Sequence, residues 1–179
     1  MAFSRPKKHS YSEDELYEYA VGALARRMRT VAELKRLFRA RVEDAESEYG
    51  QTLIELVVRR LKDRGYLNDS QYAAYFSSLR RDNQKFGRLR VITDLKIKGV
   101  HGDVIDKAVD TAFAAVSEEQ QARDYLRRKR LVKPKDQKAT ARIFRQLARA
   151  GFGAKTIFTI LKTWDVGDEI LTELENETA

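Results

Sequence analysis

The sequence predicts an all-α protein, a tandem array of three three-helix units that is elongated and curved. Apolar residues recur at three- and four-residue spacing along most of the chain, whereas the alternation typical of a strand is scarce. Only two prolines interrupt the 179 residues. One spaced pattern also occurs twice, 52 residues apart: Leu, three residues, Gly, an apolar residue, four residues and Ile. The two copies are LKIKGVHGDVI at 95–105 and LARAGFGAKTI at 147–157.

The apolar stripes and their end signals predict nine helices. Three starts have the spacing of a capping box, in which a hydroxyl and an acid or amide satisfy free backbone N–H groups: Ser12-x-x-Glu15, Thr30-x-x-Glu33 and Ser117-x-x-Gln120. Asn68 or Asp69 can cap the helix that begins near Ser70. The expected helices are 13–28, 31–41, 50–64, 70–83, 88–98, 103–115, 118–131, 137–149 and 154–164.

The repeated pattern shows which residues of the expected units correspond to one another. Leu95, Gly99 and Ile105 correspond to Leu147, Gly151 and Ile157. We expect each matched glycine, and Gly65 as well, to end a helix in the left-handed conformation, and each matched isoleucine to anchor a third helix. A weaker copy has Leu37, Arg41 and Val42, followed about six residues late by Leu53 or Ile54.

This register divides the chain into five segments. Short bundles bury little surface alone and are stabilised by neighbours, as in helical repeats. We expect a flexible N-terminus at 1–11, repeats at 12–66, 67–116 and 117–164, and an acidic tail at 165–179.

The composition indicates a basic body with an acidic end. The net charge is +8, and residues 165–179 hold six acids and no base. Residues 1–164 therefore carry all 35 bases and 21 of the 27 acids, a net charge of +14. Such a body suggests a polyanion or an acidic protein surface as partner, although plain solubility is an alternative. No membrane span or signal peptide is expected, and the absence of cysteine suits the cytoplasm.

Two groups of basic residues are candidate contacts for DNA or a protein partner. Like charges so crowded repel one another unless a partner relieves them, and a solvated face is the alternative. The first group is Arg26, Arg27, Arg29, Lys35, Arg36 and Arg39; Arg41 lies beside it. The second is Arg123, Arg127, Arg128, Lys129, Arg130 and Lys133, continued by the stripe Arg142, Arg145 and Arg149.

The aromatic residues do not clearly interleave with these bases. Tyr72, Tyr75, Phe76 and Phe86 have core spacing, so the sequence favours packing over the base stacking that single-strand binders use. Trp164 completes the last apolar stripe and is expected to pack in the same way.

No catalytic, cofactor or metal constellation is evident. His9 and His101 have no cysteine or second histidine at ligand spacing, and no phosphate-binding glycine loop occurs. Asp103, Asp106 and Asp110 share one helical side, which is more typical of a solvated face. We therefore expect no enzyme, no cofactor and no metal.

An ordered set of residues resembles the RecX family of regulatory proteins. One stretch reads Leu61-x-x-x-Gly65-Tyr66-Leu67-Asn68-Asp69-x-x-Tyr72-Ala73, and Asp69 lies in its capping pair. The match continues through Arg80, Gly87, Leu89, Ile92, Leu95, Lys98, Gly99 and Ile105, and then through Arg149-Ala150-Gly151-Phe152 with Ile157. It covers roughly residues 12–164. Arg41 departs from it, because the family often has glycine there.

The resemblance implies a modulator of the RecA recombinase. Such a protein binds RecA filaments on single-stranded DNA and inhibits ATP hydrolysis, strand exchange and filament growth, which modulates recombination, DNA repair and the SOS response. It further implies a RecA partner, contact with single-stranded and in some cases double-stranded DNA, and no membrane partner; we expect a monomer. The alternative is a basic nucleic-acid-binding protein without a recombinase partner.

Overall fold

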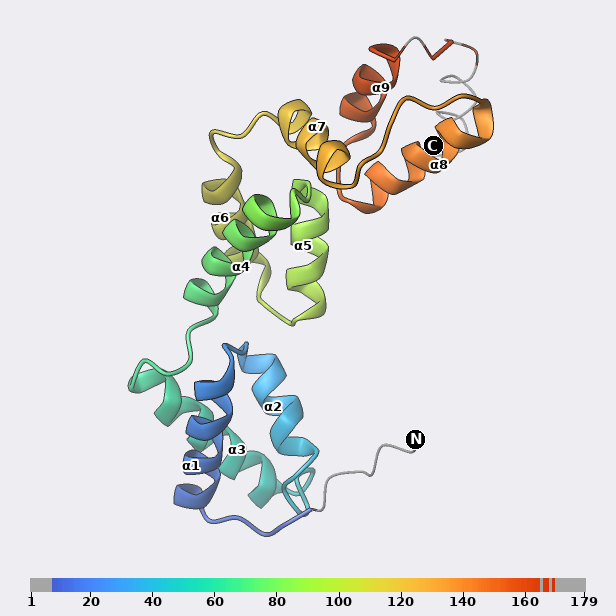
Figure 1. The fold of residues 1–179 in the computed structure, drawn as a ribbon. Helices are drawn as coiled ribbons and strands as arrows, with labels where there is room; N and C mark the ends of the chain where they lie inside the picture. The colour runs from blue at the N-terminus through green and yellow to red at the C-terminus, as the bar shows by residue number, and fades with distance from the viewer. Residues whose placement is uncertain (1–7, 165, 168, 170–179) are drawn as a thin grey trace. The chain divides into compact units, whose positions relative to one another are not determined.

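The computed structural model describes residues 8–164, 166, 167 and 169. Over these residues the chain forms nine α-helices and no strand (Figure 1), which confirms the all-α class. The helices are α1 (Glu13–Arg26), α2 (Val31–Arg39), α3 (Glu48–Asp63), α4 (Asp69–Gln84), α5 (Arg88–Ile97), α6 (Gly102–Phe113), α7 (Glu118–Arg128), α8 (Gln137–Arg149) and α9 (Ala154–Lys162).

The helix starts follow the local capping signals closely. Ser12 and Thr30 form complete capping boxes with Glu15 and Glu33. The third expected box is only half formed. Ser117 accepts a hydrogen bond from the Gln120 N–H at 3.3 Å, but the Gln120 amide donates to Asp124, one turn further on. The Asp124 carboxylate, four residues after Gln120, therefore accepts the hydrogen bond from the side-chain amide that was expected to complete the box.

The chain divides into two compact units, each with its own core. Unit 1 comprises the described residues up to Ala73 together with Lys96–Val104, and unit 2 comprises Ala74–Leu95 and the described residues from Ile105 onward. In unit 1, α3 packs against both α1 and α2, and in unit 2, α9 packs against both α7 and α8. In these two triplets the third helix thus contacts both of the others.

The matched positions of the repeat carry the core. Leu95 and Leu147 are fully buried, and Ile105 and Ile157 are each 1 % exposed. Gly65, Gly99 and Gly151 have φ values of +75°, +75° and +89°, and they follow the ends of α3, α5 and α8. An L-residue at these φ values would cost roughly 1–2 kcal/mol.

The first, weaker copy differs from its expected register. Leu37 is only partly buried, whereas Phe38, the next residue, is fully buried. Arg41 does not adopt a positive φ; Asp44 does, with φ +50°. The inserted loop after α2 moves the left-handed turn three residues along the chain. Just after this loop, in the first turn of α3, Gly50 packs so closely that a Cβ there would lie 2.4 Å from the Asp44 carbonyl oxygen.

The described end of the N-terminal segment makes backbone contacts with the loop after α2. The His9 N–H donates to the Arg41 carbonyl oxygen, and the Glu43 N–H donates to the His9 carbonyl oxygen, both at 2.8 Å. This isolated parallel bridge ties residue 9 to the loop after α2. Residues 1–7, and the acidic tail apart from residues 166, 167 and 169, lie outside the described residues.

Candidate polyanion-binding groove

Helix α8 presents three arginines on the side opposite its core face. Ile143, Phe144 and Leu147 are buried in unit 2, while Arg142, Arg145 and Arg149 are exposed. The spacing of three and four residues keeps the arginines on one helical side. At 1.5 Å rise per residue, they extend along about 10 Å of the helix.

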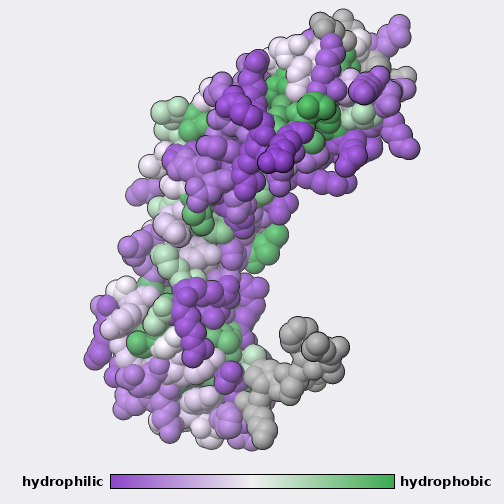
Figure 2. Space-filling model, viewed as in Figure 1, coloured by the Kyte–Doolittle hydropathy of each residue, from purple (hydrophilic) through white to green (hydrophobic). Residues whose placement is uncertain are grey.

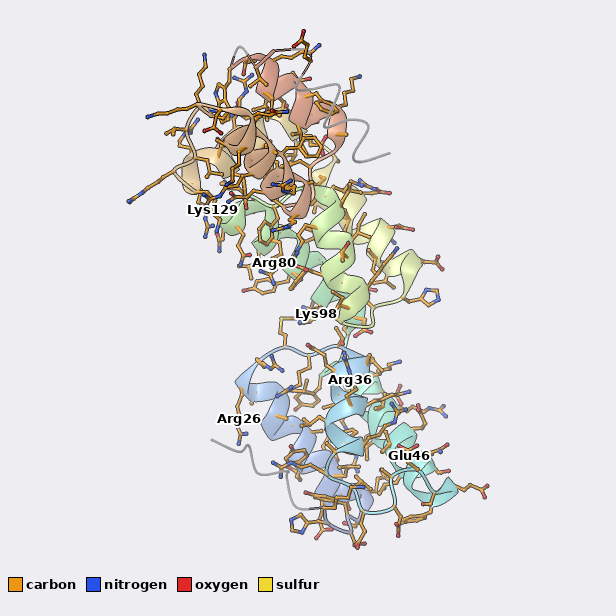
Figure 3. The ribbon with its side chains drawn as sticks, turned by 90° about the vertical axis from the view of Figure 1, so that its right-hand side faces the viewer. Arg26, Arg36, Glu46, Arg80, Lys98 and Lys129 are labelled. Carbon is orange, nitrogen blue, oxygen red and sulfur yellow. The ribbon has the colours of Figure 1, made fainter. Side chains whose placement is uncertain are left out.

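These arginines line a groove of about 480 Å³ in unit 2. Two further cations from other elements reach it, namely Arg90 of α5 and Lys129 at the end of α7. Phe86, Tyr125, Gln146 and Ala150 complete the lining, and no carboxylate belongs to it. Figure 3 shows Lys129 among several long side chains that end in nitrogen, and Figure 2 shows how hydrophilic side chains cover much of the displayed face.

The two aromatic residues that line the groove, Phe86 and Tyr125, belong to a row of rings that continues into the unit 2 core. The Phe86 and Tyr125 rings lie 6.2 Å apart, and the Tyr125 and Phe152 rings lie 5.8 Å apart. Tyr125 is 5 % exposed and belongs to the core, whereas Phe86 is half-buried. Phe86 is thus the more exposed of the two rings that line the groove. The sequence predicts a core position for Phe86, but its ring is only partly buried against the core.

Arg90 is oriented by a buried carboxylate. Its Nε lies 3.0 Å from Oδ1 of Asp94, one turn further along α5, and its guanidinium carbon lies 5.7 Å from the Phe86 ring centroid. Asp94 is 9 % exposed, and Arg80 approaches its other oxygen at 3.7 Å. Arg80 itself lies over the Phe76 and Phe86 rings. The Asp94 carboxylate therefore holds one arginine behind the groove and one at its edge.

The groove exists because the turn before α5 docks on the end of α8. The Gly87 N–H donates to the Ala150 carbonyl oxygen at 2.8 Å, and the Leu89 N–H donates to the Gly151 carbonyl oxygen at 3.2 Å. A Cβ on Gly87 would lie 2.3 Å from the latter oxygen. This backbone contact brings Phe86 and Arg90 beside Arg149, although they are about 60 residues apart in sequence.

The three α8 arginines of the groove lack the ion pairs that other basic residues have, including Arg90 in the same groove. Within the described part of the chain, no carboxylate pairs with Arg142, Arg145 or Arg149, whereas Arg123 pairs with Glu119 and Arg127 pairs with Asp124 at 3.4 Å. Of the second predicted group, only Lys129 lines the groove; Arg128, Arg130 and Lys133 are exposed outside it.

The first predicted group is spread over α1, the following turn and α2 in unit 1. Lys35 pairs with Glu55 at 2.5 Å, and Arg29 and Arg36 donate to carbonyl oxygens of Ala23 and Ala32. Arg26, Arg27 and Arg39 are exposed, and Figure 3 shows Arg26 and Arg36 on neighbouring helices. These residues form a looser basic surface than the groove.

Other candidate chemistry is not assembled in the described residues. They contain no group of three histidine, aspartate or glutamate side chains that could hold a metal ion. His101 is exposed and faces Asp103 at 3.7 Å, and Asp110 pairs with Arg88. No described helix is long and apolar enough to cross a membrane.

The described residues define an all-α protein with a basic groove that two aromatic rings help to line. No protein-family model matches the chain. The regulatory protein RecX of Deinococcus radiodurans is 35% identical over 162 residues, covering 88% of this chain and 72% of that protein. The regulatory protein RecX of Myxococcus xanthus is 34% identical over 161 residues, covering 83% of each. The chain therefore belongs to the RecX family of regulatory proteins.

Solved structures agree on the fold. The crystal structure of RecX from Lactobacillus salivarius has a TM-score of 0.61 and 19% identity, and the match covers 86% of this chain and 96% of that one. A second crystal structure of a regulatory protein RecX has a TM-score of 0.62 and 18% identity. At this level of identity the likeness bears on the fold alone.

Proposed function

We propose that the protein binds RecA filaments on single-stranded DNA and inhibits their ATP hydrolysis, strand exchange and growth, and so modulates recombination, DNA repair and the SOS response. The observation that carries the proposal is the carboxylate-free groove of five cations, in a chain that belongs to this regulatory family. The protein would act by binding and not as an enzyme, as a monomer in the cytoplasm.

The proposed contact surface has two parts. In unit 2 it comprises the groove cations together with the exposed Arg123, Arg127, Arg128, Arg130 and Lys133. In unit 1 it comprises Arg26, Arg27, Arg29, Lys35, Arg36 and Arg39. Arginine suits such a surface because its planar guanidinium stays charged and binds carboxylate or phosphate in a bidentate way.

The direct test is RecA-catalysed ATP hydrolysis on single-stranded DNA with this protein added at stoichiometric ratios. We expect slower hydrolysis and shorter filaments in electron micrographs. The variant R127A/R128A/R130A should inhibit more weakly while its helical circular dichroism stays normal, because all three side chains are exposed. Unchanged hydrolysis, filament length and strand exchange with the wild-type protein would contradict the proposal.

A second candidate function is nucleic-acid binding without a recombinase partner, which the aromatic floor of the groove supports. Binding would then depend on phosphate contacts, and log K should fall by about 0.7 per phosphate neutralised as log salt rises on single strands. Tight, salt-dependent DNA binding without any effect on RecA would favour this function over the first.

A further inference from the structure

We propose that the unit 2 groove is a subsite for single-stranded nucleic acid, in which the α8 arginines hold successive phosphates and the Phe86–Arg90 pair holds one base. The inference rests on the proposed function and sharpens it, because it assigns this surface to the nucleic acid of the filament and not to an acidic surface of the recombinase.

The spacing of the arginines fits a phosphate backbone. Arg142, Arg145 and Arg149 are exposed on one side of α8, along about 10 Å of helix. One DNA strand carries a charge about every 3.4 Å along the axis of a stacked duplex, and an extended single strand spaces its phosphates more widely, so this length faces roughly two to three phosphates. Their mutual repulsion is unrelieved by any described carboxylate, and a run of phosphates would relieve all three together.

The aromatic floor distinguishes a base from a carboxylate. An acidic protein segment would satisfy the arginines but would leave the exposed part of the half-buried Phe86 ring uncovered. A base would cover that ring and could also stack on the Arg90 guanidinium, and such stacking is the means by which proteins hold single strands. Asp94 supports this arrangement, because its bond to Arg90 Nε at 3.0 Å restrains the guanidinium beside the ring. Bases within a duplex are stacked on one another and are not accessible to Phe86.

The volume of the groove lies within the range of ligand-binding pockets. Pockets for small ligands occupy about 300–1,000 Å³, mostly apolar with a few polar groups. This groove has about 480 Å³ and departs from that composition by carrying five cations. A groove that combines aromatic rings with five cations suits a ligand that has planar bases and a negatively charged backbone.

The test measures binding of three fluorescent probes by anisotropy in the absence of RecA: oligothymidine, an abasic oligomer of equal length, and polyglutamate of equal charge. We expect oligothymidine to bind at least roughly fivefold more tightly than the abasic oligomer, since stacking of one base is worth about 1–3 kcal/mol. The variant F86L keeps an apolar side chain in the core and should lose most of this preference.

The arginine variants test the phosphate part. R142A/R145A/R149A should reduce the slope of log K against log salt by about 2, because three phosphate contacts are lost at about 0.7 each. Alanine favours the helix and all three positions are exposed, so the fold should persist. The matched control R59A/K107A/K155A removes the same charge from exposed positions outside the groove and should change the slope much less.

Each outcome decides the inference. Equal affinity for oligothymidine and the abasic oligomer, equal affinity for polyglutamate, or F86L with an unchanged base preference would overturn it. Failure of the proposed function is a separate result. Normal RecA hydrolysis with an intact base preference would remove the recombinase partner and leave the subsite in place.

Discussion

In each unit the start of one helix packs against the residues at the end of a distant helix, and the two contacts differ in chemistry. In unit 1 the start of α2 meets the residues after α5. The Thr30 hydroxyl donates to the Lys98 carbonyl oxygen at 2.7 Å, and Gly99 lies against Ala32. In unit 2 the start of α5 meets the end of α8, where the Gly87 N–H donates to the Ala150 carbonyl oxygen at 2.8 Å.

Side-chain hydrogen bonds and an ion pair stabilise the contact at the start of α2, here called the unit 1 joint. Backbone hydrogen bonds form the contact between the start of α5 and the end of α8, here called the unit 2 joint. Around Thr30, Glu33 pairs with Lys98 at 2.9 Å, and Asp69 accepts from the Val31 N–H at 2.9 Å. The unit 2 joint depends instead on two glycines whose missing Cβ atoms let backbones touch. Charge and pH should therefore affect the unit 1 joint, while added volume should affect the unit 2 joint most.

The largest effect is expected for Gly151→Ala. The new Cβ would lie 2.1 Å from the Arg90 backbone nitrogen, at φ +89°. The left-handed conformation costs about 1–2 kcal/mol and overpacking about 1–3, so the free energy of unfolding should fall by roughly 3 kcal/mol. Urea unfolding followed by the fluorescence of Trp164, which packs on the unit 2 core, measures this.

Gly22→Ala is the matched control for that substitution. Gly22 lies within α1 and has no positive φ, and a Cβ there would meet no neighbouring atom within 4 Å. Alanine there should stabilise α1 by up to about 1 kcal/mol. A Gly151→Ala protein that unfolds at the wild-type urea concentration would refute the backbone joint.

Gly99→Ala should cost less and should be rescued in part. Its Cβ would lie 2.5 Å from the Cβ of Ala32, a side-chain atom that can be removed. We expect a loss of about 2 kcal/mol, mostly from the left-handed conformation. In a double-mutant cycle with Ala32→Gly, the coupling should be favourable by about 1 kcal/mol. Strict additivity would show that the two residues do not touch.

Asp69 should be replaceable by asparagine but not by alanine. Burial raises the pKa of the Asp69 carboxyl group, and this outweighs the hydrogen bond from the Val31 N–H, which lowers it. Asp69→Ala should cost about 1 kcal/mol, as for a lost helix cap, whereas Asn keeps the acceptor oxygen.

The pH dependence of Asp69 provides the control. A raised carboxyl pKa gives stability that is present at low pH and is lost as pH rises through the folded pKa. The melting temperature of Asp69→Asn relative to wild type should therefore be higher at pH 7 than at pH 3. A relative melting temperature that is the same at both pH values would contradict the raised pKa.

The smallest effect is expected for Glu33→Gln, with the opposite pH dependence. Burial would raise the pKa of Glu33, but hydrogen bonds from Lys98 and the Thr30 N–H outweigh it and lower the pKa. The stability from this group is then present above the unfolded value of about 4.3 and is lost as pH falls through the folded pKa. We expect a loss of a few tenths of a kcal/mol at pH 7, because solvent screens the pair.

Thermal unfolding at pH 7 and pH 3 measures the Glu33 effect. The difference between wild type and Glu33→Gln should shrink at pH 3, and it should also shrink in 1 M salt at pH 7. A difference that grows as the pH falls would reverse the sign of the proposed interaction.

Much of the fold could be predicted because its signals are local. The apolar stripes predicted all nine described helices, with ends within a few residues, and the left-handed glycines lie where the repeat placed them. The first copy was predicted in part: the late Leu53 and Ile54 are buried, but the inserted loop after α2 places the left-handed turn at Asp44 and not at Arg41. Tyr75 was also misjudged: it has core spacing but is 58 % exposed.

The sequence by itself determined the helices, their caps and the glycine turns, because each depends on interactions within about four residues of the chain. Only the tertiary structure decided that Asn68, and not Asp69, caps α4, because Asp69 bonds to Val31, 38 residues away. The same holds for the groove. Arg90 and Phe86 reach the α8 arginines only through the glycine contact at Gly87 and Gly151, and no local pattern encodes which distant backbones will touch.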